Sequence, residues 1–205
     1  MGRGHIRHNG PMGTQLVLAS GSPRREELLS HLGVNFVVQI PQVDESVRSR
    51  EVPELYVQRV ASAKAAAVDG DVVLGADTSV VLGDQIYGKP INLEHAAAML
   101  WELSGKVHKV MTGVTVQTKD LLLCEVVTTR VEFVSLDQSL IDWYLNLGES
   151  SDKAGAYALQ GAGSCLVKAI DGSHSNVIGL PLAETATLLT QAGVTLRSST
   201  GSNKL

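Results

Sequence analysis

An eleven-residue run from Val72 to Leu82 places the strongest constraint on how this chain can fold. Most of its positions are apolar, and the apolar residues do not alternate with polar ones as they would in a strand with one solvated face. Such a run is typical of a central strand that is buried on both faces. The segment Gly75-Ala76-Asp77-Thr78 interrupts the run and brings one carboxylate, that of Asp77, into apolar surroundings.

The rest of the chain alternates between strand and helix patterns, and strands then cluster in its middle. A short strand at residues 16–19 leads into Gly21-Ser22-Pro23, where Ser22 suits a helix N-cap and Pro23 suits the first helical turn. Further strands are predicted at residues 34–40, 85–87, 107–117 and 121–134, the last two as an antiparallel pair. Further helices are predicted to begin near Pro53, Asn92, Asp137 and Pro181. We therefore expect an α/β fold in which helices flank a mixed central sheet.

Length and composition suit one folded domain. The chain has 205 residues, of which 44% are hydrophobic and only 4% aromatic, so aliphatic side chains must fill the core. We expect a single domain over residues 14–195, preceded by an expression leader at residues 1–13 and followed by an unstructured tail at residues 196–205. No stretch approaches the roughly 20 apolar residues of a membrane span, and no secretory signal is present, so a cytoplasmic protein is expected.

Charge and cysteine content argue against several classes of protein. The formal net charge of -4 disfavours a broad basic surface for nucleic acid but leaves room for a local basic pocket that binds a small anion. The two cysteines, Cys124 and Cys165, stand far apart in no CxxC pattern, so neither a disulfide framework nor a zinc site is expected. The glycine patterns of dinucleotide-binding folds, P-loops and nucleophile elbows are absent.

Arg24 and Arg25 conflict with the usual charge pattern of a helix start. Cations in a first helical turn oppose the helix dipole, at a cost of about 0.3 to 1 kcal/mol each. A bound anion beside Gly21, Ser22 and the free backbone N–H groups would explain both arginines. Two solvated arginines whose cost is tolerated would explain them equally well, so this pattern alone leaves both interpretations open.

Asp77 is the second conflict, because a carboxylate is costly to bury unless it is paired or binds a metal. It is therefore a candidate catalytic base or metal ligand, and the alternative is that it caps a turn at the strand end. Other charged residues, taken singly, are typical of solvated surface positions. Together they offer cations for phosphates and carboxylates for a divalent ion and for activating water, as triphosphate chemistry needs. These residues are Asp44, Glu45, Arg59, Lys64, Lys89 and Lys153.

Eight distinctive blocks stand in order along residues 16–193. They are LASGSPRR (18–25), VDES (43–46), RVASAKA (59–65), GADTSV (75–80), YGKP (87–90), LSGKVHKVMTGV (103–114), GESSDKAGAYALQG (148–161) and SNVIGLPLAET (175–185). With these blocks the chain resembles the Maf family of nucleoside triphosphate pyrophosphatases. The resemblance implies two lobes around a cleft, a homodimer, and cleavage between the α and β phosphates with the help of Mg²⁺ or Mn²⁺.

The resemblance also implies roles for individual residues. Asp77 stands where the family places its proton acceptor, and we expect Glu45 and Asp77 to hold the metal. The residues expected to bind the phosphates are Ser20, Ser22, Arg25, Lys64, Lys89 and Lys153.

Three further positions distinguish subfamilies: Arg24, Thr78 and Gln160 match the form that acts on dTTP and UTP rather than on 7-methyl-GTP. A glutamine suits a pyrimidine because it can both donate to and accept from the O4 and N3 edge. Two alternatives differ in class. One is a nucleotide-binding regulator of cell division with little catalysis, and the other is a nucleic-acid binder, which the acidic balance disfavours.

Overall fold

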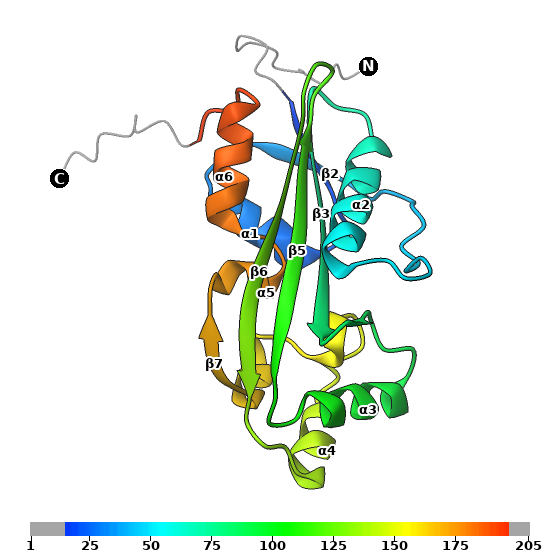
Figure 1. Ribbon diagram of the computed structural model, residues 1–205. Helices are drawn as coiled ribbons and strands as arrows, with labels where there is room; N and C mark the ends of the chain where they lie inside the picture. Colours follow the sequence, from blue (N-terminus) through cyan, green and yellow to red (C-terminus); the bar gives the residue numbers. More distant parts are fainter. Residues whose placement is uncertain (1–14, 197–205) are drawn as a thin grey trace, which may run out of the picture.

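A computed structural model describes residues 15–196 and shows a mixed sheet flanked by helices (Figure 1). The sheet order is β2-β1-β3-β5-β6-β7, and the short β4 pairs with β3 outside this path. The strands are β1 (Leu16–Ala19), β2 (Phe36–Gln39), β3 (Val72–Leu82), β4 (Gln85–Tyr87), β5 (Val107–Gln117), β6 (Leu122–Phe133) and β7 (Val167–Asp171). The predicted α/β class is confirmed. The predicted leader, and the predicted tail beyond its first residue, lie outside the described residues.

Strand directions divide the sheet into two parts. β1 runs parallel to both β2 and β3, whereas β3, β5, β6 and β7 pair successively in antiparallel fashion. The predicted pairing of the two long strands β5 and β6 is confirmed. The strand predicted at residues 85–87 is also confirmed, and it pairs with β3 in a hairpin around Gly83 and Asp84. β1 and β2 run in the same direction as β3, and the turn that contains Gly21 follows directly after the carboxyl end of β1.

β3 runs without a break through Gly75–Thr78, where the sequence predicted an interruption. Every residue there pairs with a partner on β5, and Asp77 stands opposite Gly113. The prediction of a break was wrong because pairing with neighbouring strands outweighs the weak strand preference of glycine and aspartate. Asp77 therefore lies in the interior of a strand, and the alternative that it caps a turn at the strand end is excluded.

The helices lie on both faces of the sheet and at one of its ends (Figure 1). Asn92 and Asp137 cap α3 and α4 by accepting from the N–H groups of His95 and Leu140, as predicted. Ser22 also stands at an N-cap position, but its side chain makes no capping hydrogen bond within the described residues. The helices are α1 (Pro23–Ser30), α2 (Pro53–Ala66), α3 (Leu93–Leu103), α4 (Gln138–Asn146), α5 (His174–Ile178) and α6 (Leu182–Gln191).

Alternate residues of β1 pack on opposite faces of the sheet. Leu16 and Leu18 join a cluster with leucines of α1 and α6, whereas Val17 and Ala19 pack with Ala65 of α2. This period of two is what a strand requires when both of its faces are covered. The central sheet is therefore buried between α2 on one side and α1 with α6 on the other.

A separate cluster of buried residues fills the other end of the molecule, where α3 and α4 lie (Figure 1). Phe133 and Tyr144 are among its largest members, and the far halves of β3, β5 and β6 contribute to it. Two short 3₁₀ turns, Ala154–Ala156 and Gly161–Leu166, complete this part of the fold. The three long strands thus join two lobes, each with its own apolar cluster.

Two glycines bring α2 unusually close to the sheet. A Cβ atom on Gly75 would lie 2.3 Å from the carbonyl oxygen of Ala61, and one on Gly113 would lie 2.4 Å from that of Val57. Any side chain at either position would meet helix backbone, which cannot rotate away as a flexible side chain can. This close approach lets a lysine on α2 reach a carboxylate on β3.

Candidate active site

A cleft of roughly 580 Å³ opens beyond the carboxyl end of β1, a size typical of small-molecule sites. β1 ends at Ala19, opposite Gly75, whereas β3 continues to Leu82. The second half of β3 therefore has no β1 neighbour and faces the cleft. Eleven residues expected to bind phosphate, metal or base line this cleft: Ser20, Ser22, Arg24, Arg25, Glu45, Lys64, Asp77, Thr78, Lys89, Lys153 and Gln160. Two other charged residues that the sequence suggested for triphosphate chemistry, Asp44 and Arg59, lie outside the lining.

Lys64 lies between two carboxylates at the centre of the cleft. Its ammonium nitrogen is 2.8 Å from Oδ1 of Asp77 and 3.0 Å from Oε1 of Glu45. Lys64 and Asp77 are both buried, at 6% and 5% exposure, whereas Glu45 stands on an exposed loop. The ion pair supplies the partner that a buried carboxylate needs, because an uncompensated buried charge is strongly destabilising.

The same carboxylates fit a divalent cation. Oxygens of Glu45 and Asp77 converge on one atom, as they would around a metal, and Mg²⁺ commonly takes one or two protein carboxylates together with phosphate oxygens and water. Within residues 15–196 no group of three or more histidine, cysteine, aspartate or glutamate side chains forms a larger candidate site. The chemistry of this pair therefore suits a metal that shares its ligands with a phosphate, provided that the ammonium of Lys64 moves aside.

Arg25 is buried and turned into the protein. Its Nε donates to the carbonyl oxygen of Gly179 at 2.8 Å, while Nη2 donates to Oγ1 of Thr78 at 3.0 Å and Nη1 to Oγ of Ser20 at 3.3 Å. Burial lowers the pKa of this guanidinium, and Asp77 counteracts the effect. Arg25 thus ties together three segments of the cleft wall, and its remaining two N–H groups are what it can offer to a phosphate.

Thr78 and Asp77 project from opposite faces of β3, because they are consecutive in a strand. Asp77 meets Lys64 of α2, whereas Thr78 contacts Arg25 of α1 and Oγ1 of Thr112, the latter at 2.9 Å. The predicted proton acceptor and one predicted specificity residue therefore belong to different walls of the cleft.

Asp152 joins two of the predicted residues, and sequence reasoning missed it. It accepts from Nη1 of Arg24 at 3.0 Å and from Nζ of Lys153 at 2.5 Å. Partial burial works to raise the pKa of Asp152, but the hydrogen bonds from Lys153 and Arg24 lower it to about 2. Asp152 therefore connects the start of α1 to the segment of residues 148–161. The only signal in the sequence was an acidic residue directly before Lys153.

Hydrogen bonds on both sides of Gln160 hold the turn that carries it. The backbone N–H of Ala158 donates to the hydroxyl of Tyr144 at 3.0 Å, and the carboxylate of Glu149 accepts from backbone N–H groups that follow Gln160. A Cβ on Gly163 would lie 2.1 Å from the carbonyl oxygen of Ala158, so the chain folds back tightly on itself. The half-buried amide of Gln160 is thus presented to the cleft from a fixed position.

Ser20, Ser22 and Lys89 complete the lining. Oγ of Ser20 accepts from the backbone N–H of Ser22 at 3.2 Å, which shapes the turn before α1. Lys89 follows β4 on an exposed segment, where the carbonyl oxygen of Gly88 accepts from the N–H of Gly155 at 3.1 Å. That contact joins the two stretches that carry Lys89 and Lys153.

Five basic and three acidic side chains thus share one cleft in a mixed α/β sheet. This combination of cations and carboxylates is typical of proteins that bind a small polyanion together with a divalent cation. The family model described as Maf-like protein matches residues 15–192, and the chain belongs to the Maf family.

Several curated relatives of this chain carry one name, "dTTP/UTP pyrophosphatase". The chain is 52% identical to that of Anaeromyxobacter dehalogenans (strain 2CP-C) over 189 residues, which is 90% of this chain and 97% of the relative. It is 49% identical to that of Myxococcus xanthus (strain DK1622), over 89% of this chain and 95% of the relative. It is 46% identical to that of Symbiobacterium thermophilum, over 87% and 94% respectively.

Proposed function

We propose that this protein hydrolyses dTTP and UTP to the nucleoside monophosphate and pyrophosphate. The cleft carries the proposal, because it surrounds a buried carboxylate, Asp77, with the cations and the second carboxylate that triphosphate hydrolysis requires. The name shared by relatives about half identical over nearly their whole length supports the choice of substrates. Modified pyrimidine nucleotides belong to the same substrate class.

Binding of the triphosphate is assigned to the turn before α1 and to the lysines around it. The serines and backbone N–H groups of that turn would bind phosphate oxygens, with Arg25 holding the turn in place. Lys64, Lys89 and Lys153 would stabilise the negative charge that develops on the departing pyrophosphate. Because Lys64 also pairs with Asp77, an arriving phosphate would draw its ammonium away from that carboxylate.

Asp77 would then accept the proton of the attacking water. Its position in the interior of β3 fixes the carboxylate against a rigid sheet, which is the kind of support that a general base needs. Glu45 and Asp77 would hold Mg²⁺ or Mn²⁺, which when bound would neutralise charge on the phosphates. Base selection is assigned to Arg24, Thr78 and Gln160, whose amide can both donate to and accept from a pyrimidine edge.

The deciding experiment is a panel of nucleoside triphosphates with Mg²⁺ and measurement of released pyrophosphate. Wild type should prefer dTTP and UTP, and Asp77→Asn should lose about 10² to 10⁴ in turnover. Asp84→Asn, in the exposed β3–β4 turn, is the matched control and should keep its activity. A protein that binds dTTP, as seen by a raised melting temperature, but releases no product would be a nucleotide-binding regulator instead.

We also propose a homodimer in the cytoplasm with no stable nucleic-acid partner. The dimer is an expectation from the family resemblance, and the net charge of -4 supports the absence of nucleic acid. Over residues 15–196, no helix is long and apolar enough to cross a membrane. Light scattering on the purified protein would give its mass in solution, and a monomer would overturn the dimer.

A further inference from the structure

The loop of residues 40–52 carries Glu45 into the cleft, although it contains neither helix nor strand. Most of its residues are exposed, and Arg50 adopts a left-handed backbone conformation with φ of 58°. An irregular loop of this length keeps one shape only where specific contacts hold it. The position of Glu45 beside Lys64 therefore needs a cause outside the loop itself.

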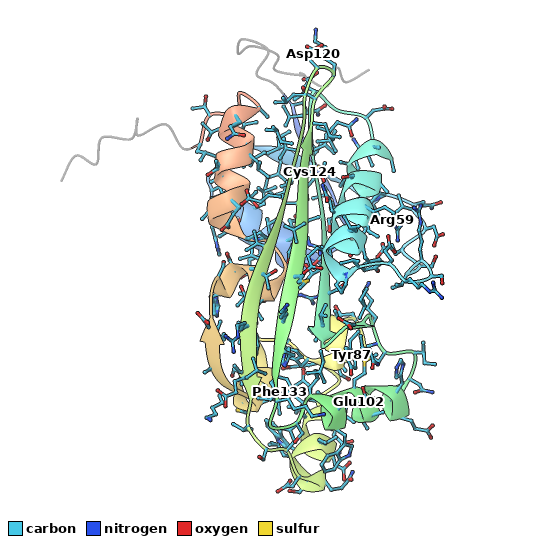
Figure 2. All side chains as sticks on the ribbon, viewed as in Figure 1. Arg59, Tyr87, Glu102, Asp120, Cys124 and Phe133 are labelled. Atoms are coloured by element: carbon cyan, nitrogen blue, oxygen red, sulfur yellow. The ribbon has the colours of Figure 1, made fainter. Side chains whose placement is uncertain are left out.

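Arg59 of α2 supplies the strongest of these contacts. Its Nε donates to Oε1 of Glu51 at 2.6 Å and its Nη2 to Oε2 at 2.8 Å, which makes a bidentate ion pair. Nη2 also donates to the carbonyl oxygen of Ser46 at 2.9 Å, the residue directly after Glu45. Figure 2 shows Arg59 on the outer side of α2, directed toward this loop. Bidentate arginine–carboxylate pairs combine strength with fixed geometry, so the loop is held at two points.

Tyr56 provides a second connection between Arg59 and Glu45. The hydroxyl of Tyr56 donates to the carbonyl oxygen of Glu45 at 2.9 Å, and the guanidinium carbon of Arg59 lies 5.5 Å from the centre of the Tyr56 ring. Glu51 in turn accepts from the backbone N–H of Arg48 at 2.9 Å. The contacts of Arg59 thus reach Glu45 itself through Tyr56 and the chain after it through Ser46 and Glu51.

The electrostatics agree with this geometry. The side chains of Arg59 and Glu51 are only 20% and 9% exposed, so the pair is shielded in part from water. The hydrogen bonds from Arg59 lower the pKa of the Glu51 carboxyl to about 2, so the pair is fully charged at neutral pH. Arg59 is not part of the cleft lining, so its effect on Glu45 passes through the loop and through Tyr56.

We propose that Arg59 is a positioning residue that fixes Glu45 at the metal-binding edge of the cleft by pairing with Glu51. The proposal rests on the proposed function, since it takes Glu45 as a ligand of the metal–nucleotide. Removing such an outer support commonly costs 10- to 100-fold in metal affinity or activity. Arg59→Ala should therefore lose about that factor in turnover of dTTP, and it should need more Mg²⁺ for half-maximal rate.

Arg48→Ala is the matched control. Arg48 lies in the same loop and carries the same charge, but it joins the network only through its backbone N–H and carbonyl, which alanine keeps. Its turnover and Mg²⁺ requirement should stay within about twofold of wild type. Glu51→Gln should resemble Arg59→Ala, and Arg59→Lys, which keeps the charge without the bidentate geometry, should restore only part of the loss. These two variants also serve if Arg59→Ala does not fold.

A double-mutant cycle with Glu45→Gln separates positioning from a general loss of structure. If Arg59 acts through Glu45, adding Arg59→Ala to Glu45→Gln should cause little further loss of turnover. If Arg59→Ala lowers turnover by the same factor in the Glu45→Gln variant as in wild type, the proposal is overturned. So would Arg59→Ala enzyme with the turnover and Mg²⁺ requirement of wild type.

Limited trypsin digestion tests the tether without any activity. The loop contains two trypsin sites, after Arg48 and after Arg50. Wild type and the Arg48→Ala control should be cut slowly after Arg50, whereas Arg59→Ala and Glu51→Gln should be cut at least several-fold faster, because cleavage follows local opening. Unchanged cleavage would overturn the tether. If wild type releases no pyrophosphate, the proposed function fails, and the digestion still decides whether Arg59 holds the loop.

Discussion

The ammonium of Lys64 and the carboxylate of Asp77, 2.8 Å apart, form a buried ion pair between α2 and β3. Both side chains are buried, so neither charge is well solvated alone. The glycines at 75 and 113 make the pair possible, because they let α2 lie directly on the sheet. The same two residues thus stabilise the fold and take part in the proposed catalysis.

Lys64→Met should be strongly destabilising. It keeps the length and apolar stem of lysine but leaves Asp77 buried without its cation, a loss that costs about 3 to 5 kcal/mol in comparable pairs. Urea unfolding at pH 7 measures the change, and the double variant Lys64→Met/Asp77→Asn should regain part of the loss because it removes the unpaired charge. Single and double variants of equal stability would contradict this account.

The same pair predicts when a metal can bind. In wild type the ammonium lies between the two carboxylates, so Mn²⁺ without nucleotide should raise the melting temperature little. In Lys64→Met the two carboxylates repel each other with no cation between them, and Mn²⁺ should stabilise the protein clearly. Thermal melts with and without Mn²⁺ give the comparison, and Glu45→Gln added to Lys64→Met should abolish the effect. Equal stabilisation of wild type would argue against this arrangement.

Gln160→Glu should reduce selectivity for dTTP and UTP. The carboxylate can accept hydrogen bonds but cannot donate, so it loses one contact with the pyrimidine edge and gains repulsion from O4. A site that leaves a buried hydrogen bond unmade discriminates strongly, and we expect a loss of at least about 10-fold in kcat/KM for both substrates. The exposed Gln85 provides the control substitution Gln85→Glu. An unchanged preference across the nucleotide panel would remove Gln160 from base recognition.

Much of the fold could be predicted because local signals and tertiary packing agree. Helix caps at Asn92 and Asp137, and the long β5–β6 pair, are marked by residues whose preferences match their final structure. The break predicted within β3 was wrong for the opposite reason. The weak local preferences of Gly75 and Asp77 are outweighed by pairing with β5, which the local pattern does not contain.

The candidate site divides in the same way. Residues at the start of α1 and in β3 stood out because their charges conflict with local rules, and the structure brings them into one cleft. Asp152 and Arg59 gave no such signal, since a charge in a loop or on a helix surface is ordinary. Asp152 pairs with Arg24 from a distant part of the sequence, and Arg59 pairs with Glu51 in a loop whose path no local pattern defines.

Gly113→Ala should weaken the fold and the site together. Its Cβ would stand 2.4 Å from the carbonyl oxygen of Val57, so α2 would have to move away from the sheet. Overpacking of this kind costs about 1 to 3 kcal/mol, and displacement of α2 would also shift Lys64, so turnover should fall. Gly88→Ala meets no atom within 4 Å and is the control for stability in urea unfolding. A Gly113→Ala protein as stable as that control would show that the helix has room.

His108 should make the protein less stable as the pH falls from 6.5 toward 4. It is 1% exposed, its Nε2 contacts the hydroxyl of Tyr157 at 2.8 Å, and burial lowers its pKa from 6.5 to about 4. In this window the unfolded chain binds a proton at His108 and the folded protein does not, so acid favours unfolding. The difference corresponds to about 3 kcal/mol across the window.

His108→Gln keeps a partner for Tyr157 but cannot titrate, so the difference in unfolding free energy between wild type and variant should narrow by about that amount on acidification. Urea unfolding at pH 7 and pH 4 measures the gap, with His31→Gln as the exposed control, and parallel stability curves for wild type and His108→Gln would show that His108 does not drive the loss.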